Sequence, residues 1–444
     1  MSWAPPLMDW GVAAGLLLGS VVALMALGMP VAFAFLASNI LGVYLFMGGL
    51  GGINQLIANA TSSVTSFILV PVPLFVLMGS LFFHSGLARR VFDTLDLCIG
   101  NLKGRLAYLT VLNGTIFAAL SGSSMANTAM LGSLMVPEMQ RRGYKTSLAI
   151  GPILGCGGLA ILIPPSTLAV LLASLGRIDV GALLVAGILP GFLLAFFYIL
   201  LIWLHLRLDP EAASGYAVDA VGIGEKIRAI VVNILPMSLL VFAVIGLIIL
   251  GIATPSEAAA FGVLAVIILT ALFGSLSVDC LRKAAMDGVR ITGMTFLILI
   301  GSSTFSQILA FSGATSGFID LAANLDLTPL TMLLCMLAVL LILGMFMDQL
   351  SMMLLTLPIF MPVAASLGFD PIWFAVIILL ALEISLITPP FGLLLFVMVG
   401  AVPKEIRFDQ VVLAALPYIA AAMIVTAMIV VWPGLALFLP GLMR

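Results

Sequence analysis

Residues 161–166 read Ile161-Leu-Ile-Pro-Pro-Ser166, and residues 386–391 read Leu386-Ile-Thr-Pro-Pro-Phe391. The two Pro-Pro pairs lie 225 positions apart, as 389 − 164 shows. Two further pairs share this offset, namely Pro137 with Pro362 and Gly143 with Gly368. Several matches at one offset, without a gap, predict that the chain consists of two related halves.

The composition indicates that both halves lie in a membrane. Of the 444 residues, 63% are hydrophobic and 8% are charged, and the mean hydropathy is +1.32. Soluble domains carry about 25% charged residues, so this chain lacks the polar surface to face water. Its apolar runs are continuous, which favours helices over a barrel. With about 20 residues per crossing, the length allows about ten to twelve crossings. The candidate spans are 7–27, 30–48, 66–84, 106–120, 148–175, 181–205, 229–251, 255–275, 291–311, 330–347, 371–400 and 410–439.

Several other classes of protein are disfavoured. The net charge of −2 comes without a basic block, so no nucleic-acid partner is expected. The sequence has no H-E-x-x-H, G-x-S-x-G or nucleotide-binding loop motif, so neither an enzyme nor an ATP-driven pump is expected. The first apolar run continues without a cleavage site and is expected to stay as a helix. The cysteines and histidines are too scattered to predict disulfides or a metal cluster: Cys98, Cys156, Cys280, Cys335, His84 and His205.

Charged and polar stretches predict how the chain is organised. The polar stretch 207–228 is expected to link a first repeat, 1–206, to a second repeat, 229–444. Segments 88–105 and 278–290 mix charges with apolar residues at helical spacing, as interfacial helices do. Basic clusters around Arg105 and Arg141 flank only about 35 residues, and both are expected in the cytoplasm. The segment between them is therefore predicted to enter the membrane and return as a re-entrant hairpin.

Each proline pair is predicted to break a membrane helix. Proline has no N–H, so carbonyls of the preceding turn lose their donors. Transporters use such breaks in paired repeats, where the freed carbonyls hold a coupling cation and helix N-termini face anionic substrate. The polar runs 121–128 and 348–351 would form the tips of two hairpins that meet the breaks. Such prolines can be only packing devices, but two in register favour transport. Asp348 and Glu383, in apolar surroundings, are functional candidates.

Six stretches together resemble the large membrane subunit of TRAP transporters, the DctM-type permease, over nearly the whole chain. They are Ser121-Gly-Ser-Ser124, Pro137-Glu-Met-Gln-Arg-Arg-Gly-Tyr144, Ile161-Leu-Ile-Pro-Pro-Ser166, Ala253-Thr-Pro-Ser-Glu-Ala-Ala-Ala260, Gly344-Met-Phe-Met-Asp348 and Leu382-Glu-Ile-Ser-Leu-Ile-Thr-Pro-Pro-Phe-Gly392.

The resemblance implies an all-α, multi-pass protein of the bacterial inner membrane. It implies an inverted-repeat ion-transporter fold with two re-entrant hairpins, in which an elevator transport domain slides against a scaffold. The implied activity is sodium-coupled uptake of a small organic acid such as a C4-dicarboxylate. A periplasmic binding protein would deliver the acid, and a separate four-helix membrane subunit of the DctQ type would brace this chain. Sodium would be the coupling ion, and no cofactor is implied.

The resemblance also implies site residues. One sodium site would use mostly backbone carbonyls of Ser121, Ser124, Ala160, Ile163 and Pro165. Its counterpart in the second half would use Gly344, Ser385, Thr388 and Phe391. The hairpin residues expected to face substrate are Ser123, Asn127, Thr128, Asp348 and Gln349. Where the family often has Asn-Leu-Glu-Ile-Gly, this chain has Ala381 and Ser385 in place of Asn and Gly, which affects the second ion site.

The sequence is also compatible with other functions. A self-sufficient ion-coupled carrier with a related hairpin fold, such as a dicarboxylate or arsenite carrier, would need no binding protein. A passive channel would conduct without saturation, and a membrane-embedded enzyme would need a catalytic constellation that the sequence does not offer.

Overall fold

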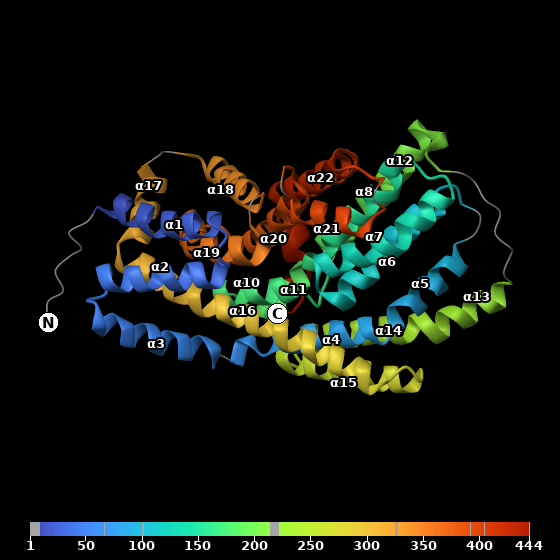
Figure 1. Ribbon diagram of the computed structural model, residues 1–444, viewed down its shortest axis with the longest axis horizontal. Coiled ribbons are helices and arrows are strands. Elements are labelled where there is room, and N and C mark those ends of the chain that lie inside the picture. Colours follow the sequence, from blue (N-terminus) through green and yellow to red (C-terminus); the bar gives the residue numbers. More distant parts are fainter. Residues whose placement is uncertain are drawn as a thin grey trace.

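The computed structural model describes residues 9–65, 67–99, 102–213, 222–324, 327–345, 347–390, 392–403 and 405–443. Within these ranges every regular element is helical. Six helices are long and apolar enough to cross a membrane, or up to eight if each of two bent pairs is one span. Most helices run roughly along the long axis of the molecule (Figure 1). The predicted all-α, multi-pass fold is confirmed, and each predicted span overlaps at least one helix.

The helices before the linker are α1 (Trp10–Ala26), α2 (Val31–Phe46), α3 (Leu50–Val64), η1 (Phe67–Leu69), α4 (Pro71–His84), α5 (Leu87–Cys98), α6 (Arg105–Ser121), α7 (Ser124–Arg141), α8 (Thr146–Gly157), α9 (Leu159–Leu162), α10 (Thr167–Gly176), α11 (Val180–Ala186) and α12 (Ile188–Leu208). The remaining elements are η2 (Pro210–Ala212), α13 (Ile223–Ala229), η3 (Ile230–Ile234), α14 (Leu235–Ile249), α15 (Pro255–Leu272), α16 (Val278–Phe311), α17 (Ala314–Asn324), α18 (Pro329–Gly344), α19 (Gln349–Ser366), α20 (Pro371–Ile387), α21 (Leu393–Ala401), α22 (Phe408–Val431) and α23 (Gly434–Gly441).

The offset found between the proline pairs also relates helix boundaries. Helix α7 and helix α19 both begin and end 225 positions apart. The same offset relates the start of α8 to the start of α20, and the end of α9 to the end of α20. Gly143 and Gly368, which follow α7 and α19, have φ values of 76° and 75°. The two sequences therefore specify the same local structure in both halves around the predicted hairpins and breaks.

Helices α8 and α20 form the core that carries the breaks. Every described residue of α20 from Trp373 to Ile387 is buried, and α8 is buried from Leu148 onward. A helix that is apolar all round belongs in a protein interior, because no face is suited to water. Helices α7 and α22 pack against α8, and α18 and α19 pack against α20. The breaks that follow these helices are therefore held on a rigid frame.

The predicted interfacial segments differ in the structure. Segment 88–105 contains most of α5, which bends by 62° from α4 after Gly86, whose φ is 74°. Segment 278–290 is not a separate helix but the first part of α16, which runs without a break for 34 residues. At 1.5 Å per residue, α16 is about 51 Å long, so it exceeds a hydrocarbon core of about 30 Å. Its charged start can therefore extend beyond the apolar layer.

The start of the predicted linker is tied to the α7–α8 connection. The Lys145 backbone N–H donates to the Ala212 carbonyl at 2.9 Å, and the Lys145 ammonium lies 2.5 Å from the Asp209 carboxylate. Residues 214–221 of the linker lie outside the described residues. Helix α13 and the π-helical segment η3 then lead directly into α14.

Candidate substrate and ion site

Two helical hairpins lie on opposite sides of the centre of the molecule (Figure 1). Helices α6 and α7 form the first hairpin, which turns at Gly122, where φ is 59°. Helices α18 and α19 form the second. Each returning helix has a side-chain cap, because Ser123 accepts from the Ala126 N–H and Asp348 accepts from the Leu350 and Ser351 N–H groups. Local sequence thus fixes where each hairpin turns.

Each proline pair interrupts a helix as the sequence predicts. Helix α9 ends before Pro164-Pro165 and α10 begins after it, while α20 ends before Pro389-Pro390 and α21 begins after it. Because a helical carbonyl normally accepts from the residue four positions on, the prolines remove the donors of the Ala160 and Ile161 carbonyls. These oxygens lie in the buried centre of the first half.

The tip of the first hairpin contacts the first break. A Cβ added at Gly122 would lie 3.3 Å from the Pro165 carbonyl oxygen and 3.4 Å from Thr167 Oγ1. One turn further along, the Asn127 amide donates to the Cys156 carbonyl at 3.0 Å and to the Gly114 carbonyl at 3.3 Å. These bonds join both helices of the hairpin to the helix that leads into the break.

The second hairpin meets the second break in a comparable way. A Cβ added at Gly344 would lie 2.2 Å from Ser385 Cβ, so α18 approaches α20 closely at this point. The Gln349 amide donates to the Leu382 carbonyl at 3.4 Å, and the Ser385 hydroxyl donates to the same oxygen at 2.8 Å. Thr388 caps its own helix by donating to the Ile384 carbonyl at 2.6 Å.

A cavity of about 310 Å³ lies where the two hairpin tips meet. Gly122, Ser123, Asp348 and Gln349 line it from the two tips, and Thr167 lines it from the start of α10. Residues of α4 and α16 also line it. Three of the five residues predicted to face substrate therefore border one cavity, although they come from different halves of the chain. Contact with substrate itself stays a prediction.

The other two predicted substrate residues do not line the cavity. Asn127 and Thr128 are buried on α7, and Thr128 Oγ1 would lie 2.1 Å from a Cβ added at Gly157. Three side-chain oxygens on this first part of α7 are buried without a hydrogen-bond partner, namely Ser124 Oγ, Asn127 Oδ1 and Thr128 Oγ1. Buried oxygens of this kind are unfavourable unless a donor or a cation meets them.

The remaining predicted ion-site residues have different surroundings. Ser121 is the last residue of α6, and Phe391 lies outside the described residues. Ile163 and Pro165 are part of the first break, and Gly344, Ser385 and Thr388 surround the second. Their role as ion ligands stays a prediction. Glu383, a further candidate, is fully buried with its carboxylate against Gly158, and it does not line the cavity.

Sequence reasoning missed one polar pair at the cavity wall. His84 Nε2 on α4 lies 2.7 Å from the Asp287 carboxylate on α16, and Asp287 lines the cavity. The Ser80 hydroxyl donates to the same carboxylate at 3.4 Å. The two partners are 203 residues apart, so no local pattern marks them as a pair. Asp287 also lies in the charged start of α16, among Asp279, Lys283 and Arg290, so its sequence surroundings do not single it out.

The turn of the first hairpin gives a test of the contact between tip and break. Gly122→Ala and Gly251→Ala both place a Cβ at positive φ, with φ values of 59° and 65°. Each is expected to lower stability by about 1 kcal/mol. Only the Gly122 Cβ meets another group, so only Gly122→Ala is expected to reduce transport. Thermal unfolding and uptake of both variants check this. Equal uptake by the two would contradict a functional contact at the tip.

Apolar helices, two hairpins, two broken helices and a cavity shared by the hairpin tips define a multi-pass membrane transporter. A family model described as the DctM component of the tripartite ATP-independent periplasmic transporter matches residues 18–435. The chain belongs to this family, whose members are membrane components of transporters in the bacterial inner membrane.

Individual relatives match the chain over most of its length. The chain is 32% identical to YgiK of Salmonella typhimurium over 96% of this chain and 97% of that protein. It is also 32% identical to the C4-dicarboxylate TRAP transporter large permease protein DctM of Pseudomonas aeruginosa, over 84% of this chain and 86% of that one. The crystal structure of the Alcanivorax borkumensis YdaH transporter shares the fold, with a TM-score of 0.64 at 15% identity, covering 87% of this chain and 90% of that one.

Proposed function

We propose that this chain is the large membrane subunit of a sodium-coupled importer of a small carboxylate. The observation that carries the proposal is the single cavity bordered by both hairpin tips and by the start of α10. Helix N-termini attract anions, and α10 and α19 both begin at this cavity. Relatives are named for C4-dicarboxylate, ectoine and sialic acid transport, and each of these molecules carries a carboxylate.

Sodium fits the residues of the first half. It is a hard cation that prefers oxygen ligands, and the oxygens of Ser124, Asn127 and Thr128 are buried without hydrogen-bond partners. We infer that these oxygens and the carbonyls freed by Pro164 and Pro165 form one ion site. In the second half the hydroxyls of Ser385 and Thr388 donate to backbone carbonyls, and their oxygen lone pairs stay available to a cation.

The proposed movement is that of an elevator. We assign 1–206 and 229–444 as two inverted repeats joined by the linker 207–228. The hairpins and broken helices of both repeats would move as one body against a scaffold that includes α2, α4, α15 and α16. The helix boundaries related by 225 positions support the repeat assignment, and the mutual packing of the four scaffold helices supports the division.

The proposed partners are those of a tripartite system. A periplasmic binding protein would deliver the carboxylate, and a small four-helix membrane subunit would cover part of the scaffold. Helices α14 and α15 expose many large apolar side chains, among them Leu239, Phe242, Phe261 and Leu264. Lipid or a membrane partner is the suitable environment for such a surface.

The test is reconstitution in liposomes. The chain, its small subunit and its binding protein are assayed with an inward sodium gradient and, as a control, an equal potassium gradient. Succinate, sialic acid and ectoine serve as probes. With a tenfold outside-to-inside sodium ratio, we expect one of them to accumulate inside to about tenfold or more above its outside concentration, because this ratio supplies about 1.4 kcal/mol per ion. Uptake that ignores sodium would refute the coupling. Uptake without the binding protein would instead favour a self-sufficient carrier.

A further inference from the structure

A second cavity, of about 640 Å³, lies along the same interface as the hairpin cavity. Three helices line both cavities: α10, α16 and α19. On α16 the lining residues follow one face at intervals of three or four residues, namely Asp287, Ile291 and Thr295 in the hairpin cavity and Leu299, Ser302 and Ser306 in the second cavity. The two cavities are therefore successive compartments between the same helices.

The second cavity lies toward the end of α16 that is remote from its basic residues. Arg282, Lys283 and Arg290 are near the start of α16, and Ser306 is 16 to 24 residues further along. At 1.5 Å per residue this is about 24 to 36 Å, comparable with the thickness of a hydrocarbon core. Since basic residues mark the cytoplasmic side, the second cavity belongs to the periplasmic side.

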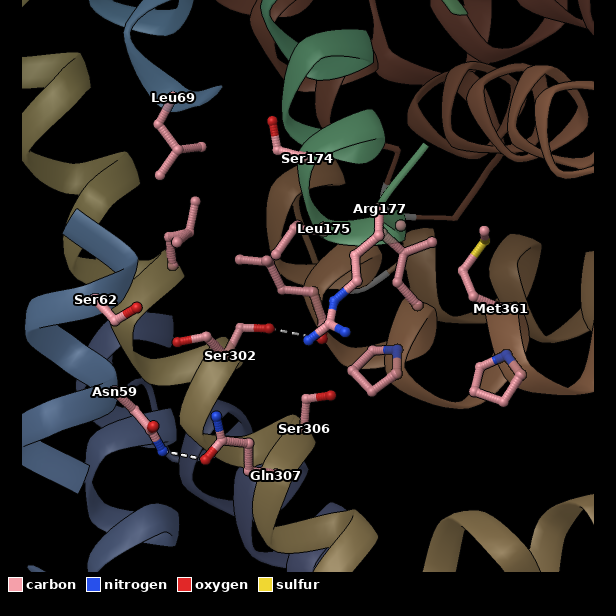
Figure 2. A pocket seen from close by; sticks show the side chains of 17 residues that line it. Asn59, Ser62, Leu69, Ser174, Leu175, Arg177, Ser302, Ser306, Gln307 and Met361 are labelled. Carbon is pink, nitrogen blue, oxygen red and sulfur yellow. Dashed lines mark hydrogen bonds between the residues drawn. The ribbon is translucent and has the colours of Figure 1, made fainter. Parts of the chain in front are cut away.

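Among the described residues that line this cavity, Arg177 is the basic one. The other described Lys and Arg residues lie at positions 89–105, 141–145, 207–228, 282–290 and 407, mostly in clusters that mark the cytoplasmic side, whereas Arg177 stands apart from them. It ends α10 with a φ of 53°, and Figure 2 shows its guanidinium turned into the cavity. In the described part of the chain, no carboxylate oxygen lies within 4.0 Å of its nitrogen atoms, and no Asp or Glu lines the cavity.

Further hydrogen-bonding groups surround Arg177. Figure 2 shows Asn59 of α3 donating to the Gln307 amide oxygen, which leaves the Gln307 amide nitrogen as a donor for the cavity. Ser62 and Ser306 add hydroxyl groups, whereas the Ser174 hydroxyl already donates to the Val170 carbonyl at 2.7 Å. A guanidinium with amide and hydroxyl groups is suited to a carboxylate, which accepts hydrogen bonds from several donors.

The charges of the two cavities are opposite. The hairpin cavity has Asp287 and Asp348 in its wall and no basic residue among its described lining residues. An anion is therefore attracted by Arg177 in the second cavity, while in the hairpin cavity two carboxylates oppose the attraction of the helix N-termini unless cations lie beside the anion. This arrangement would keep a carboxylate at the outer cavity until sodium has bound at the inner one.

We propose that the cavity of α3, α10, α16 and α19 is an external waiting site, in which Arg177 holds the carboxylate of an incoming organic acid before it reaches the hairpin tips. The inference rests on the proposed function for its substrate class. Helix α10 joins the two compartments, because it begins at one and ends at the other, about 15 Å apart.

The test measures the local potential without any transported acid. In a background with all four cysteines replaced, Ser306→Cys is modified with an anionic sulfonatoethyl and a cationic trimethylammonioethyl methanethiosulfonate reagent. The variants are studied in the full chain in right-side-out and inside-out membrane vesicles. We expect modification from the outer side, and we expect Arg177→Gln to lower the anionic-to-cationic rate ratio about fivefold to tenfold. Arg177→Lys keeps the charge and should restore most of the ratio.

The control position is Ser316→Cys on α17, which is exposed and does not line the cavity. Its rate ratio should not change with Arg177→Gln. An unchanged ratio at Ser306→Cys, no modification from either side, or modification from the inner side alone would overturn the waiting site. Because the readout needs no substrate, it stays valid if every uptake assay fails. Normal sodium-driven uptake with an unchanged ratio would refute the waiting site while leaving the proposed function intact.

Discussion

Gly187→Ala is expected to destabilise the protein severely and to abolish uptake. Gly187 joins α11 to α12, and a Cβ added there would lie 2.3 Å from the Leu162 carbonyl oxygen. Leu162 is the last residue of α9, directly before the first break. The group that must move is backbone, so a side-chain rotation cannot relieve the contact. We expect a loss of about 3 kcal/mol, at the upper end of the range for overpacking.

Two other glycines provide graded controls. A Cβ at Gly191 would lie 2.7 Å from an Ile163 side-chain carbon, which can shift, so Gly191→Ala should cost about 1 kcal/mol. Gly246 in α14 has nothing within 4 Å of an added Cβ, so Gly246→Ala should be neutral or slightly stabilising. Melting temperatures of the three variants in detergent test this order of stability. If Gly187→Ala has the same melting temperature as Gly246→Ala, the close approach of Gly187 to the Leu162 carbonyl does not stabilise the break.

Thr128→Val is expected to raise the sodium concentration for half-maximal uptake about tenfold or more. The Thr128 hydroxyl is fully buried and has no hydrogen-bond partner. Without an ion, replacing such a group by a methyl of the same shape is neutral or stabilising by about 1–3 kcal/mol. A hydroxyl that binds sodium behaves differently, because its loss removes an oxygen ligand. A higher half-saturating sodium concentration with undiminished thermal stability is therefore specific to an ion ligand.

The matched control is Thr270→Val on α15. Thr270 is equally buried, but its hydroxyl donates to the Val266 carbonyl at 2.6 Å, and it lies in the proposed scaffold. Its sodium dependence should match that of the unsubstituted protein. If Thr128→Val transports with unchanged half-saturating sodium, Thr128 is not a ligand. If it instead loses thermal stability, its role is structural.

The sequence predicted the elements that local chemistry specifies. Proline lacks an N–H wherever it stands, so the breaks at Pro164 and Pro389 could be predicted from their residues alone. The hairpin tips could be predicted in the same way, since Ser123 and Asp348 both accept hydrogen bonds from backbone N–H groups of the turn that follows. The convergence of Ser123, Asp348 and Gln349 on one cavity also followed from the paired repeats.

Other features depend on packing that no local pattern reveals. Helix α3 was missed because its Gly, Asn, Thr and Ser residues look like a loop, although one side of it packs on α16. The continuity of α16 was missed because its charged start resembles an interfacial helix. The approach of Gly187 to Leu162 and the pairing of His84 with Asp287 join distant segments, so only the tertiary structure brings them together.

Because one face of an unbroken helix lines both cavities, the number of residues in α16 sets the distance and the rotation between them. One residue inserted between Thr295 and Leu299 would rotate everything beyond it by about 100° and turn the serine side of the outer compartment away from Arg177. Seven inserted residues would nearly restore the direction but would lengthen the helix by about 10 Å. An insertion or deletion in α16 between Thr295 and Leu299 would therefore change both the direction and the distance of the outer cavity relative to the hairpin cavity.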